Sequence, residues 1–365
     1  MSEALQPASS DAPLLRVEDL VVTLPTPQGP ARILDGVSFA LYPGERLGIV
    51  GESGCGKSMT ALALMGLLPD IAQARGKLLF RGDNLLGYSE KQWCQLRGRR
   101  VAMVFQEPMT ALNPVKSIGQ QVAEGLRLHL GLSRAEAEDR ARRLLARVGL
   151  PEPRFSLRLF PHQLSGGQRQ RVVIAMALAC GPELLIADEP TTALDVTLQA
   201  QILGLLQEIA AEDGMGLVLI THDLGVVAQS TERMLVMYSG RVVEAGATRD
   251  VFAHMAHPYT RGLFVSLPQE LTDPAARRPA PPSDAAEVAG ARRARLQTIP
   301  GIVPDPLHRP VGCAFADRCY AAQADCRQRP EIRSLAGQGG SGAKTGQPSH
   351  DVACHHPHEA AQVRS

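Results

Sequence analysis

The sequence carries no excess of charge of either sign. It has 38 Lys and Arg residues against 37 Asp and Glu residues, which leaves a formal net charge of +1. Proteins that bind nucleic acid usually carry a basic excess or a basic stripe. The balance therefore argues against nucleic acid as a partner.

Long hydrophobic runs are missing as well. A membrane-spanning helix needs roughly 18 consecutive apolar residues, and the longest candidate, residues 172–180, is followed at once by Gly181, Pro182 and Glu183. Residues 1–13 lack the basic start and apolar core of a signal peptide, so we expect a disordered tail there. These absences predict a protein that is soluble or peripheral to a membrane, and cytosolic.

A disulfide framework is not expected, because cytosolic proteins keep their thiols reduced. The chain has seven cysteines in 365 residues, and 44% of its residues are hydrophobic. Such a chain can form one large domain with a smaller appendage, or two domains. Four of the cysteines crowd near its end: Cys313, Cys319, Cys326 and Cys354.

Short apolar strands alternate with helices along much of the chain. Residues 46–50 (RLGIV) are typical of a buried strand, and residues 59–68 have the spacing of a helix. This alternation predicts an α/β fold with a largely parallel sheet. Further helices are expected at residues 166–179 and 198–211, and further strands at 184–187 and 217–220.

Shifts in composition predict the domain boundaries. Residues 14–268 hold the main domain, within which the charged, Leu/Ala/Arg-rich stretch at about 88–159 predicts a helical subdomain with a capping pattern at Ser133. Residues 269–298 are rich in Pro, Ala and Arg, which is typical of a linker. Residues 299–365 form a cysteine-bearing extension with a flexible, glycine-rich insert at about 337–347.

A glycine-rich loop fits the pattern G-x-x-x-x-G-K-[ST]. Glycine allows backbone N–H groups to converge on phosphate oxygens. Lys57 would contact the β- and γ-phosphates and Ser58 would bind Mg²⁺, while the following helix points its positive end at the same anion. The loop predicted to bind ATP is Gly51, Glu52, Ser53, Gly54, Cys55, Gly56, Lys57 and Ser58.

Two carboxylates end the strand expected at residues 184–187. Asp188 would hold Mg²⁺ directly or through water, and Glu189 would act as the general base on the attacking water. The alternative is a buried strand with a solvated acidic end. Because the pair precedes PTTALD and accompanies a phosphate loop, we favour the catalytic interpretation.

LSGGQ resembles the signature sequence of ABC ATPases. Ser165 and the glycine amides that follow would open a helix and form a second phosphate-binding loop. The resemblance implies that this loop covers the γ-phosphate held by a second ATPase subunit, and that Asp195 belongs to a loop at the dimer interface. The nucleotide contacts implied in this way are Leu164, Ser165, Gly166, Gly167, Gln168 and Asp195.

Further positions match the ABC ATPase pattern one at a time. Gln106 matches the glutamine that senses Mg²⁺ and the nucleophilic water, and His222 matches the histidine that contacts the γ-phosphate and orients Glu189. Leu24 stands where an aromatic residue usually stacks on adenine, so weaker apolar contact would replace stacking. Cys55 lies at a helix N-terminus, where thiol pKa values tend to fall; it is either redox-sensitive or a filler residue.

Several longer stretches resemble the ATPases of dipeptide and oligopeptide importers, a family that includes nickel and glutathione importers. EPMT at 107–110 is similar to the D-type subunit. The resemblance implies a second ATPase (an F-type paralogue or another copy), two permeases, an extracytoplasmic binding protein, and a place on the cytoplasmic face of the bacterial inner membrane. The helical subdomain would receive a permease coupling helix. The stretches are residues 105–114, 161–167, 186–203 and 257–263.

Two alternatives remain for the function. The same machinery could import nickel, glutathione or another small solute instead of peptides. A cytosolic ABC ATPase without transport is the other class, but such proteins carry long coiled coils, inserted zinc modules or two fused ATPase domains. This chain has one motif set and a short insertion.

The four cysteines of the extension have the spacing C-x5-C-x6-C-x27-C, without the C-x2-C pairs of zinc fingers. Four thiolates can hold a [4Fe–4S] cluster, and the importer resemblance implies one in some members. Zn²⁺ and reduced thiols that only pack are the alternatives. We expect a cluster to be structural, because the segment is too small to fold without a staple.

Overall fold

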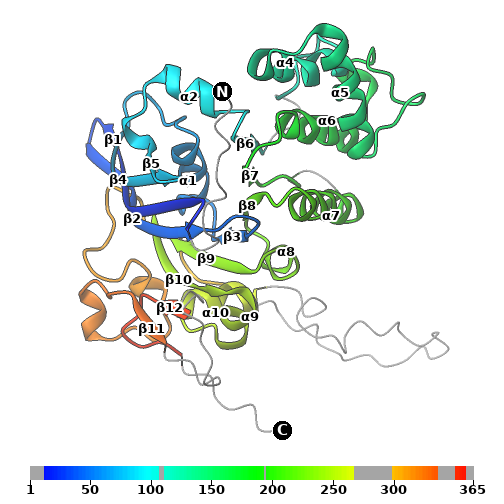
Figure 1. Ribbon diagram of the computed structural model, residues 1–365. Coiled ribbons are helices and arrows are strands. Elements are labelled where there is room, and N and C mark those ends of the chain that lie inside the picture. The colour runs from blue at the N-terminus through cyan, green and yellow to red at the C-terminus, as the bar shows by residue number, and fades with distance from the viewer. Residues whose placement is uncertain (1–11, 107–110, 193–194, 267–297, 336–349, 359–365) are drawn as a thin grey trace, which may run out of the picture.

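The computed structural model describes residues 12–106, 111–192, 195–266, 298–335 and 350–358 (Figure 1). The tail expected at 1–13 and the linker expected at 269–298 lie outside this part apart from their last residues. The insert expected at about 337–347 and the EPMT stretch at 107–110 lie wholly outside it.

A large mixed sheet is the scaffold of the molecule. Its strands follow the order β11-β12-β10-β9-β3-β8-β7-β6, and the pairs from β9 to β6 are parallel. The α/β fold is therefore confirmed. The strands are β3 (Arg46–Val50), β6 (Val101–Val104), β7 (Leu184–Asp188), β8 (Gly216–Thr221), β9 (Arg233–Tyr238), β10 (Arg241–Ala247), β11 (Arg333–Leu335) and β12 (His350–Val352).

A second, antiparallel sheet has the order β2-β1-β4-β5 and shares a hydrophobic core with the large sheet and helix α1. In β7, Leu184 and Ile186 face this core, whereas Leu185 and Ala187 face a separate core on the other side of the sheet. Both faces are thus buried, which explains why β7 reads as a continuous apolar run. The smaller sheet consists of β1 (Leu15–Thr26), β2 (Gly29–Leu41), β4 (Gln73–Phe80) and β5 (Asp83–Asn84).

Helices cover the large sheet on both faces (Figure 1). The first of them ends at Leu64, four residues earlier than predicted, because Gly66 adopts φ +60° and turns the chain. The helices are α1 (Lys57–Leu64), α2 (Glu90–Leu96), α4 (Ile118–Leu130), α5 (Arg134–Arg147), α6 (Gly166–Leu178), α7 (Val196–Glu212), α8 (Leu224–Ser230), α9 (Thr248–His254) and α10 (Pro258–Val265).

The stretch predicted to be a helical subdomain, at about 88–159, contains one strand of the large sheet. β6 pairs in parallel with β7 from Val101 to Val104. The sequence gives no signal for this strand within the predicted helical subdomain, because four apolar residues beside Arg99 and Arg100 are too few to show a period. The separate helical lobe is formed by α4, α5 and α6, which pack on one another.

The capping pattern predicted at Ser133 is confirmed. The Ser133 hydroxyl accepts a hydrogen bond from the Glu136 backbone N–H, and the Glu136 carboxylate accepts one from the Ser133 N–H. This reciprocal pair satisfies two donors at the start of α5. The domain boundaries as a whole stay predictions.

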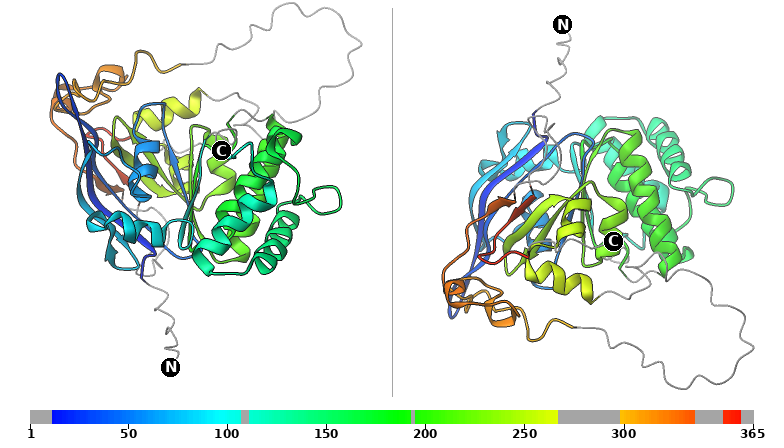
Figure 2. Two further views of the ribbon diagram at one scale, coloured as in Figure 1. Left: turned by 90° about the horizontal axis from the view of Figure 1, so that it is seen from above. Right: turned by 90° about the horizontal axis from the view of Figure 1, so that it is seen from below.

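The C-terminal extension joins the large sheet. β12 pairs antiparallel with β10, and β11 pairs with β12. Figure 2 shows the extension and the helical lobe on opposite sides of the molecule. The extension is therefore built onto the ATPase scaffold as additional strands.

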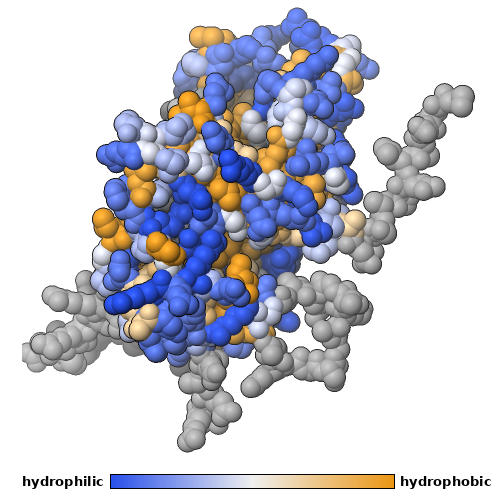
Figure 3. Space-filling model, turned by 90° about the vertical axis from the view of Figure 1, so that its left-hand side faces the viewer, coloured by the Kyte–Doolittle hydropathy of each residue, from blue (hydrophilic) through white to orange (hydrophobic). Residues whose placement is uncertain are grey.

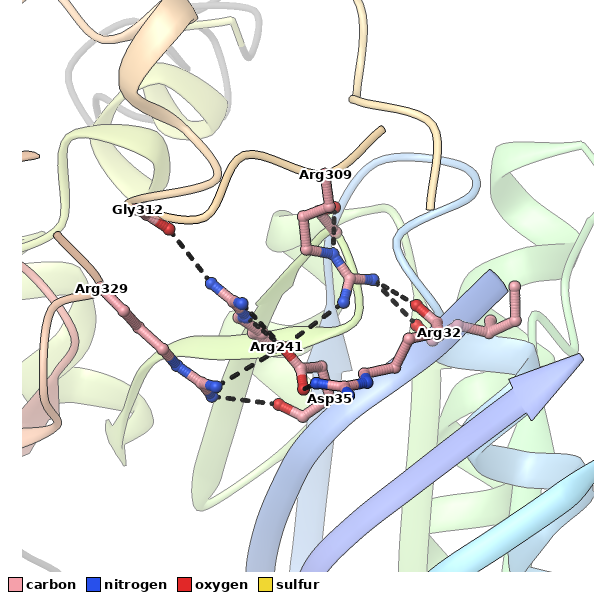
Figure 4. A network of polar contacts seen from close by, with 8 residues as sticks. Arg32, Asp35, Arg241, Arg309, Gly312 and Arg329 are labelled. Atoms are coloured by element: carbon pink, nitrogen blue, oxygen red, sulfur yellow. Dashed lines mark hydrogen bonds and ion pairs between the residues drawn. The ribbon is translucent and has the colours of Figure 1, made fainter. Parts of the chain in front are cut away.

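A buried carboxylate fastens the extension to β2. Asp35 is only 3% exposed and is surrounded by guanidinium groups, of which Arg309 and Arg329 come from the extension (Figure 4). Arg241 lies 2.7 Å from its carboxylate and Arg32 lies 3.0 Å from it. Burial by itself would raise the pKa of Asp35, but the bonds and charges of these arginines outweigh it and hold that pKa below its usual value.

Hydrophilic residues dominate the side of the molecule that carries the smaller sheet. Figure 3 shows hydrophobic residues on this side singly or in small groups among hydrophilic ones, as is usual for an ordinary protein surface. In the described part of the chain, no helix has the length and apolar character required to cross a membrane.

Asp35 should be critical for stability. Asp35→Ala would leave several arginines without a counter-charge, so we expect it to lower the free energy of unfolding by about 3 kcal/mol. Because the pKa of Asp35 is depressed in the folded state, this contribution is present above its unfolded pKa and is lost as pH falls through the folded pKa. Denaturant unfolding of the full chain at neutral and acidic pH measures both effects.

The exposed pair between Arg134 and Glu138 on α5 supplies the control. Glu138→Gln should change stability little, because exposed ion pairs contribute little. Equal unfolding midpoints for Asp35→Ala and Glu138→Gln would contradict the assigned role of Asp35.

Candidate functional site

The glycine-rich loop connects β3 to α1 and is held tightly by β9. A Cβ atom on Gly51 would lie 2.2 Å from the Met237 carbonyl oxygen, so only glycine fits there. Gly56 adopts φ +105°, a conformation that favours glycine. The loop residues are thus required by the shape of the turn as well as by a phosphate.

Lys57 is the first residue of α1 and is only 5% exposed. Its Nζ donates hydrogen bonds to the carbonyl oxygens of Gly51 at 2.8 Å and Glu52 at 3.1 Å. The ammonium therefore lies across the loop, at the positive end of α1. This is the place where a bound phosphate chain would need a cation.

Cys55 is fully buried within the loop. Burial raises the pKa of its thiol above the usual value, although the nearby Lys57 acts in the opposite direction. The expectation of a lowered pKa at the helix N-terminus is wrong, because desolvation outweighs the helix end. The filler interpretation of Cys55 is the better one.

Asp188 ends β7 and faces Ser58 of the loop. Burial raises the pKa of Asp188, while a hydrogen bond with the Ser58 side chain lowers it, and the net effect is upward. Its Oδ1 atom is buried and has no hydrogen-bond partner in the described part of the chain. A hydroxyl and an orphaned carboxylate oxygen fit a hard cation such as Mg²⁺.

Glu189 follows directly, in a left-handed backbone conformation with φ +46°. Its backbone N–H donates to the Ile220 carbonyl oxygen of β8 at 2.9 Å. Its Oε2 accepts a hydrogen bond from Gln106 Nε2 at 3.3 Å, and its Oε1 lies 3.3 Å from His222 Nδ1. The structure thus brings together Gln106, Glu189 and His222, and the contact between the last two is the one that the resemblance implied.

Thr192 also contacts this carboxylate, which the sequence analysis missed. Its hydroxyl donates to Glu189 Oε2 at 3.0 Å. The residue lies within the PTTALD stretch, so its position beside two carboxylates was the available signal. This hydrogen bond restricts the rotation of the Glu189 side chain. His222, on the other side of the carboxylate, has a side chain that is 63% exposed.

The LSGGQ residues start α6 rather than lying beside the phosphate loop. Ser165 and Gln168 form a capping box across the first turn of the helix. Ser165 and Gly166 are exposed, whereas Leu164 and Gly167 are buried. Figure 1 shows α6 with the helical lobe, away from α1, so the two loops belong to different parts of the subunit.

Asp195 caps the next helix. Its carboxylate accepts a hydrogen bond from the Leu198 N–H at 2.9 Å, at the start of α7. The residue is exposed. Leu24 is half-buried in β1, opposite Ala31 of β2. Both residues stay candidates for the roles predicted from the sequence.

The four cysteines of the extension line one small cavity. Cys313, Cys319, Cys326 and Cys354 share it with the fully buried His257. Burial raises the pKa of the Cys354 thiol to about 11, and the other three sulfurs add to that rise. The fold thus gathers thiols that are up to 41 residues apart in sequence, from 313 to 354.

The spacing of possible ligand atoms bears on which metal fits. Among the described residues, Asp325, Cys326 and His356 are the group whose ligand atoms all lie within 4.8 Å of one another. The four sulfurs together do not form so tight a group. A zinc ion with Zn–S bonds of about 2.3 Å needs a tighter set.

Two family profiles match the chain. The ABC transporter profile matches residues 34–192, which include the glycine-rich loop, LSGGQ and the two carboxylates. The profile described as "Oligopeptide/dipeptide transporter, C-terminal region" matches residues 243–326, which run from β10 through three of the four cysteines.

The similarity to curated proteins extends over nearly the whole chain. A probable peptide ABC transporter ATP-binding protein of Sinorhizobium fredii is 46% identical over 96% of this chain and 97% of its own length. The oligopeptide transport ATP-binding protein OppD of Salmonella typhimurium is 45% identical over 92% of this chain and 93% of its own.

A solved structure agrees with the fold. The ATP-binding cassette MJ0796, a dimer bound to ADP and phosphate, has a TM-score of 0.58 and 30% identity and covers 64% of this chain and 99% of its own. Together with the geometry of Lys57, Asp188 and Glu189, these likenesses leave one assignment. The chain is an ATPase and belongs to the ABC transporter family, in the group of ATP-binding proteins that carry the oligopeptide/dipeptide transporter C-terminal region.

Proposed function

We propose that this chain couples ATP hydrolysis to the uptake of dipeptides or oligopeptides across the cytoplasmic membrane. The relatives named above are described as peptide and oligopeptide transport proteins, and the likeness covers the extension as well as the ATPase core. The observation that carries the chemistry is the convergence of Gln106, His222 and Thr192 on the carboxylate of Glu189, next to Asp188.

The phosphate loop and Lys57 hold the nucleotide. On binding, the Lys57 ammonium would turn from the carbonyl oxygens of Gly51 and Glu52 to the phosphate oxygens. Ser58 and Asp188 would bind Mg²⁺, with Gln106 as a further ligand. The cation supplies charge neutralisation for the phosphate oxygens.

Glu189 would take the proton of the attacking water. Its Oε1 lies beside His222 and its Oε2 is held by Gln106 and Thr192, so the carboxylate is oriented before the water binds. Orientation of a base in this way reduces the entropy that the reaction step must lose. His222 would add a contact to the γ-phosphate.

Two subunits would complete each site. The exposed Ser165 and Gly166 at the start of α6 point out of the subunit, which suits a loop that covers the γ-phosphate bound by another subunit. Asp195 would lie at the same interface. The second subunit would be an F-type paralogue or another copy of this chain.

Membrane permeases would dock on the helical lobe, and this docking would place the protein on the cytoplasmic face of the inner membrane. Leu128 on α4 is 76% exposed, and in the segment that leads into the lobe Phe105 is 42% and Val115 is 79% exposed. Exposed apolar residues of this size are suited to a partner helix. An extracytoplasmic binding protein would deliver the peptide to the permeases.

The cysteine cavity would hold a [4Fe–4S] cluster. Four sulfurs line one cavity and supply the ligand number that a [4Fe–4S] cluster requires, and a single Zn²⁺ takes the same number. A cluster would bind thiolates, so the raised pKa values of Cys313, Cys319 and Cys354 imply that metal binding would release protons. Its role would be to tie together the short segments of the extension.

Glu189→Gln tests the catalytic role. The amide cannot accept the proton of water, so ATP turnover should fall by roughly 10²- to 10⁴-fold, while ATP binding persists and traps an ATP-bound dimer. Turnover by phosphate release and dimer formation by size-exclusion chromatography measure the two effects. Turnover close to that of the unchanged protein would refute this role for Glu189.

Peptide uptake is tested with the two permeases and the binding protein of a peptide importer. Co-expression should give a complex that purifies together, and vesicles containing it should take up labelled peptide only with ATP and the binding protein. Nickel and glutathione serve as competing solutes. Uptake of either of these, without peptide uptake, would overturn the peptide assignment while leaving the ATPase intact.

The cluster is tested on anaerobically purified protein. Iron and acid-labile sulfide should be present in about equal amounts, near four of each per chain, with a broad visible absorption band. Cys354→Ser should reduce both contents, whereas Cys94→Ser, at an exposed cysteine on α2, should change neither. Colourless protein without iron would refute the cluster, and stoichiometric zinc would support the alternative.

A further inference from the structure

We infer that Arg318 of the C-terminal extension is a positioning residue for the phosphate loop. It reaches across 266 positions in sequence to Glu52, the second residue of the loop. The extension would then complete the ATP site of its own subunit in addition to holding the cysteines. This inference rests on the nucleotide site proposed above.

The Arg318 guanidinium forms a bidentate pair with the Glu52 carboxylate. Its two terminal nitrogens lie 2.7 Å and 3.0 Å from the two carboxylate oxygens. The Arg318 side chain is 5% exposed and that of Glu52 is 30% exposed. A paired and largely buried fork of this kind fixes direction as well as distance.

The guanidinium is itself held in place by its surroundings. Its Nε donates to the Pro300 carbonyl oxygen at 2.8 Å, and one terminal nitrogen donates to the Tyr238 hydroxyl at 3.3 Å. The Phe315 and Tyr238 rings lie beside it. Because these contacts come from the extension and from the end of β9, Arg318 is a fixed point against which the loop is held.

A second contact holds the backbone of the same loop residue. The Tyr259 hydroxyl accepts a hydrogen bond from the Glu52 N–H at 2.8 Å, and the Tyr259 ring packs against Tyr238 with centroids 4.6 Å apart. On the far side of the loop, the Gly240 N–H donates to the Cys55 carbonyl oxygen at 2.8 Å. The loop is therefore held at both ends by groups outside it.

Such a brace should act on nucleotide affinity. If the pair with Arg318 is lost, ATP binding must order a looser loop, and this cost lowers affinity. Once the phosphates are bound, they hold the loop themselves, so the hydrolysis step changes little. The expected result is a rise in KM with kcat nearly constant, a pattern that a general loss of folding would not produce.

The test uses Arg318→Gln, Glu52→Gln and the double variant in the full chain. We expect each single variant to raise the Kd and KM for ATP by about 10-fold with kcat changed less than about twofold, and the double variant to be no weaker than either single one. Arg329→Gln is the matched control, because Arg329 belongs to the extension and pairs with Asp35 but not with the loop.

Several outcomes would overturn the inference. Unchanged affinity in Arg318→Gln, additive losses in the double variant, or an equal loss in Arg329→Gln would each do so. If Arg318→Gln fails to fold, Glu52→Gln carries the test, because its side chain is partly exposed. Failure of the unchanged protein to bind ATP would instead refute the proposed nucleotide site.

Discussion

The position of the phosphate loop at the end of β3 is the constraint on which the rest of the structure depends. The loop has to keep its backbone N–H groups converging, and glycine, which makes that shape accessible, also makes the loop intrinsically free. Neighbouring elements remove that freedom. The Met237 carbonyl oxygen lies so close to Gly51 that no Cβ atom fits there, and Gly240 and Tyr259 form hydrogen bonds with the loop backbone. The packing of β9, β10 and α10 around the loop follows from this requirement.

The parts of the site that could be predicted from the sequence are those whose residues are neighbours in the chain. Lys57 and Ser58 follow from one loop, and Asp188 and Glu189 from the end of one strand, because strand and loop place neighbouring residues in a known relation. A contact between His222 and Glu189 was expected from the family resemblance, and the two side chains lie 3.3 Å apart. The hydrogen bond from Gln106 to Glu189 was not expected, since the resemblance linked Gln106 to Mg²⁺ and the attacking water. The alternation of strands and helices in the sequence was enough to predict the α/β fold class and the parallel pairing of the large sheet.

The remaining features depend on contacts between distant segments. Arg318 is an ordinary arginine in the sequence, and its pairing with Glu52 appears only after the extension folds back over β9. β6 is too short to show an apolar pattern in the sequence. β11 and β12 are also short, and they can be recognised as strands only from their pairing with each other and with β10. The pKa of Cys55 could not be predicted from the sequence either, because the direction of its shift depends on burial by distant segments.

The addition of β12 to β10 also changes what the large sheet offers to other molecules. β10 is seven residues long, and β12 pairs with Glu244 and Ala245 on its outer edge, whose peptide groups would otherwise be open to another strand. β11, the outermost strand on this side of the sheet, is only three residues long. Short edge strands are poor templates for strand addition and aggregation. The association proposed for the nucleotide-binding surfaces would thereby compete with fewer contacts along the edge of the sheet.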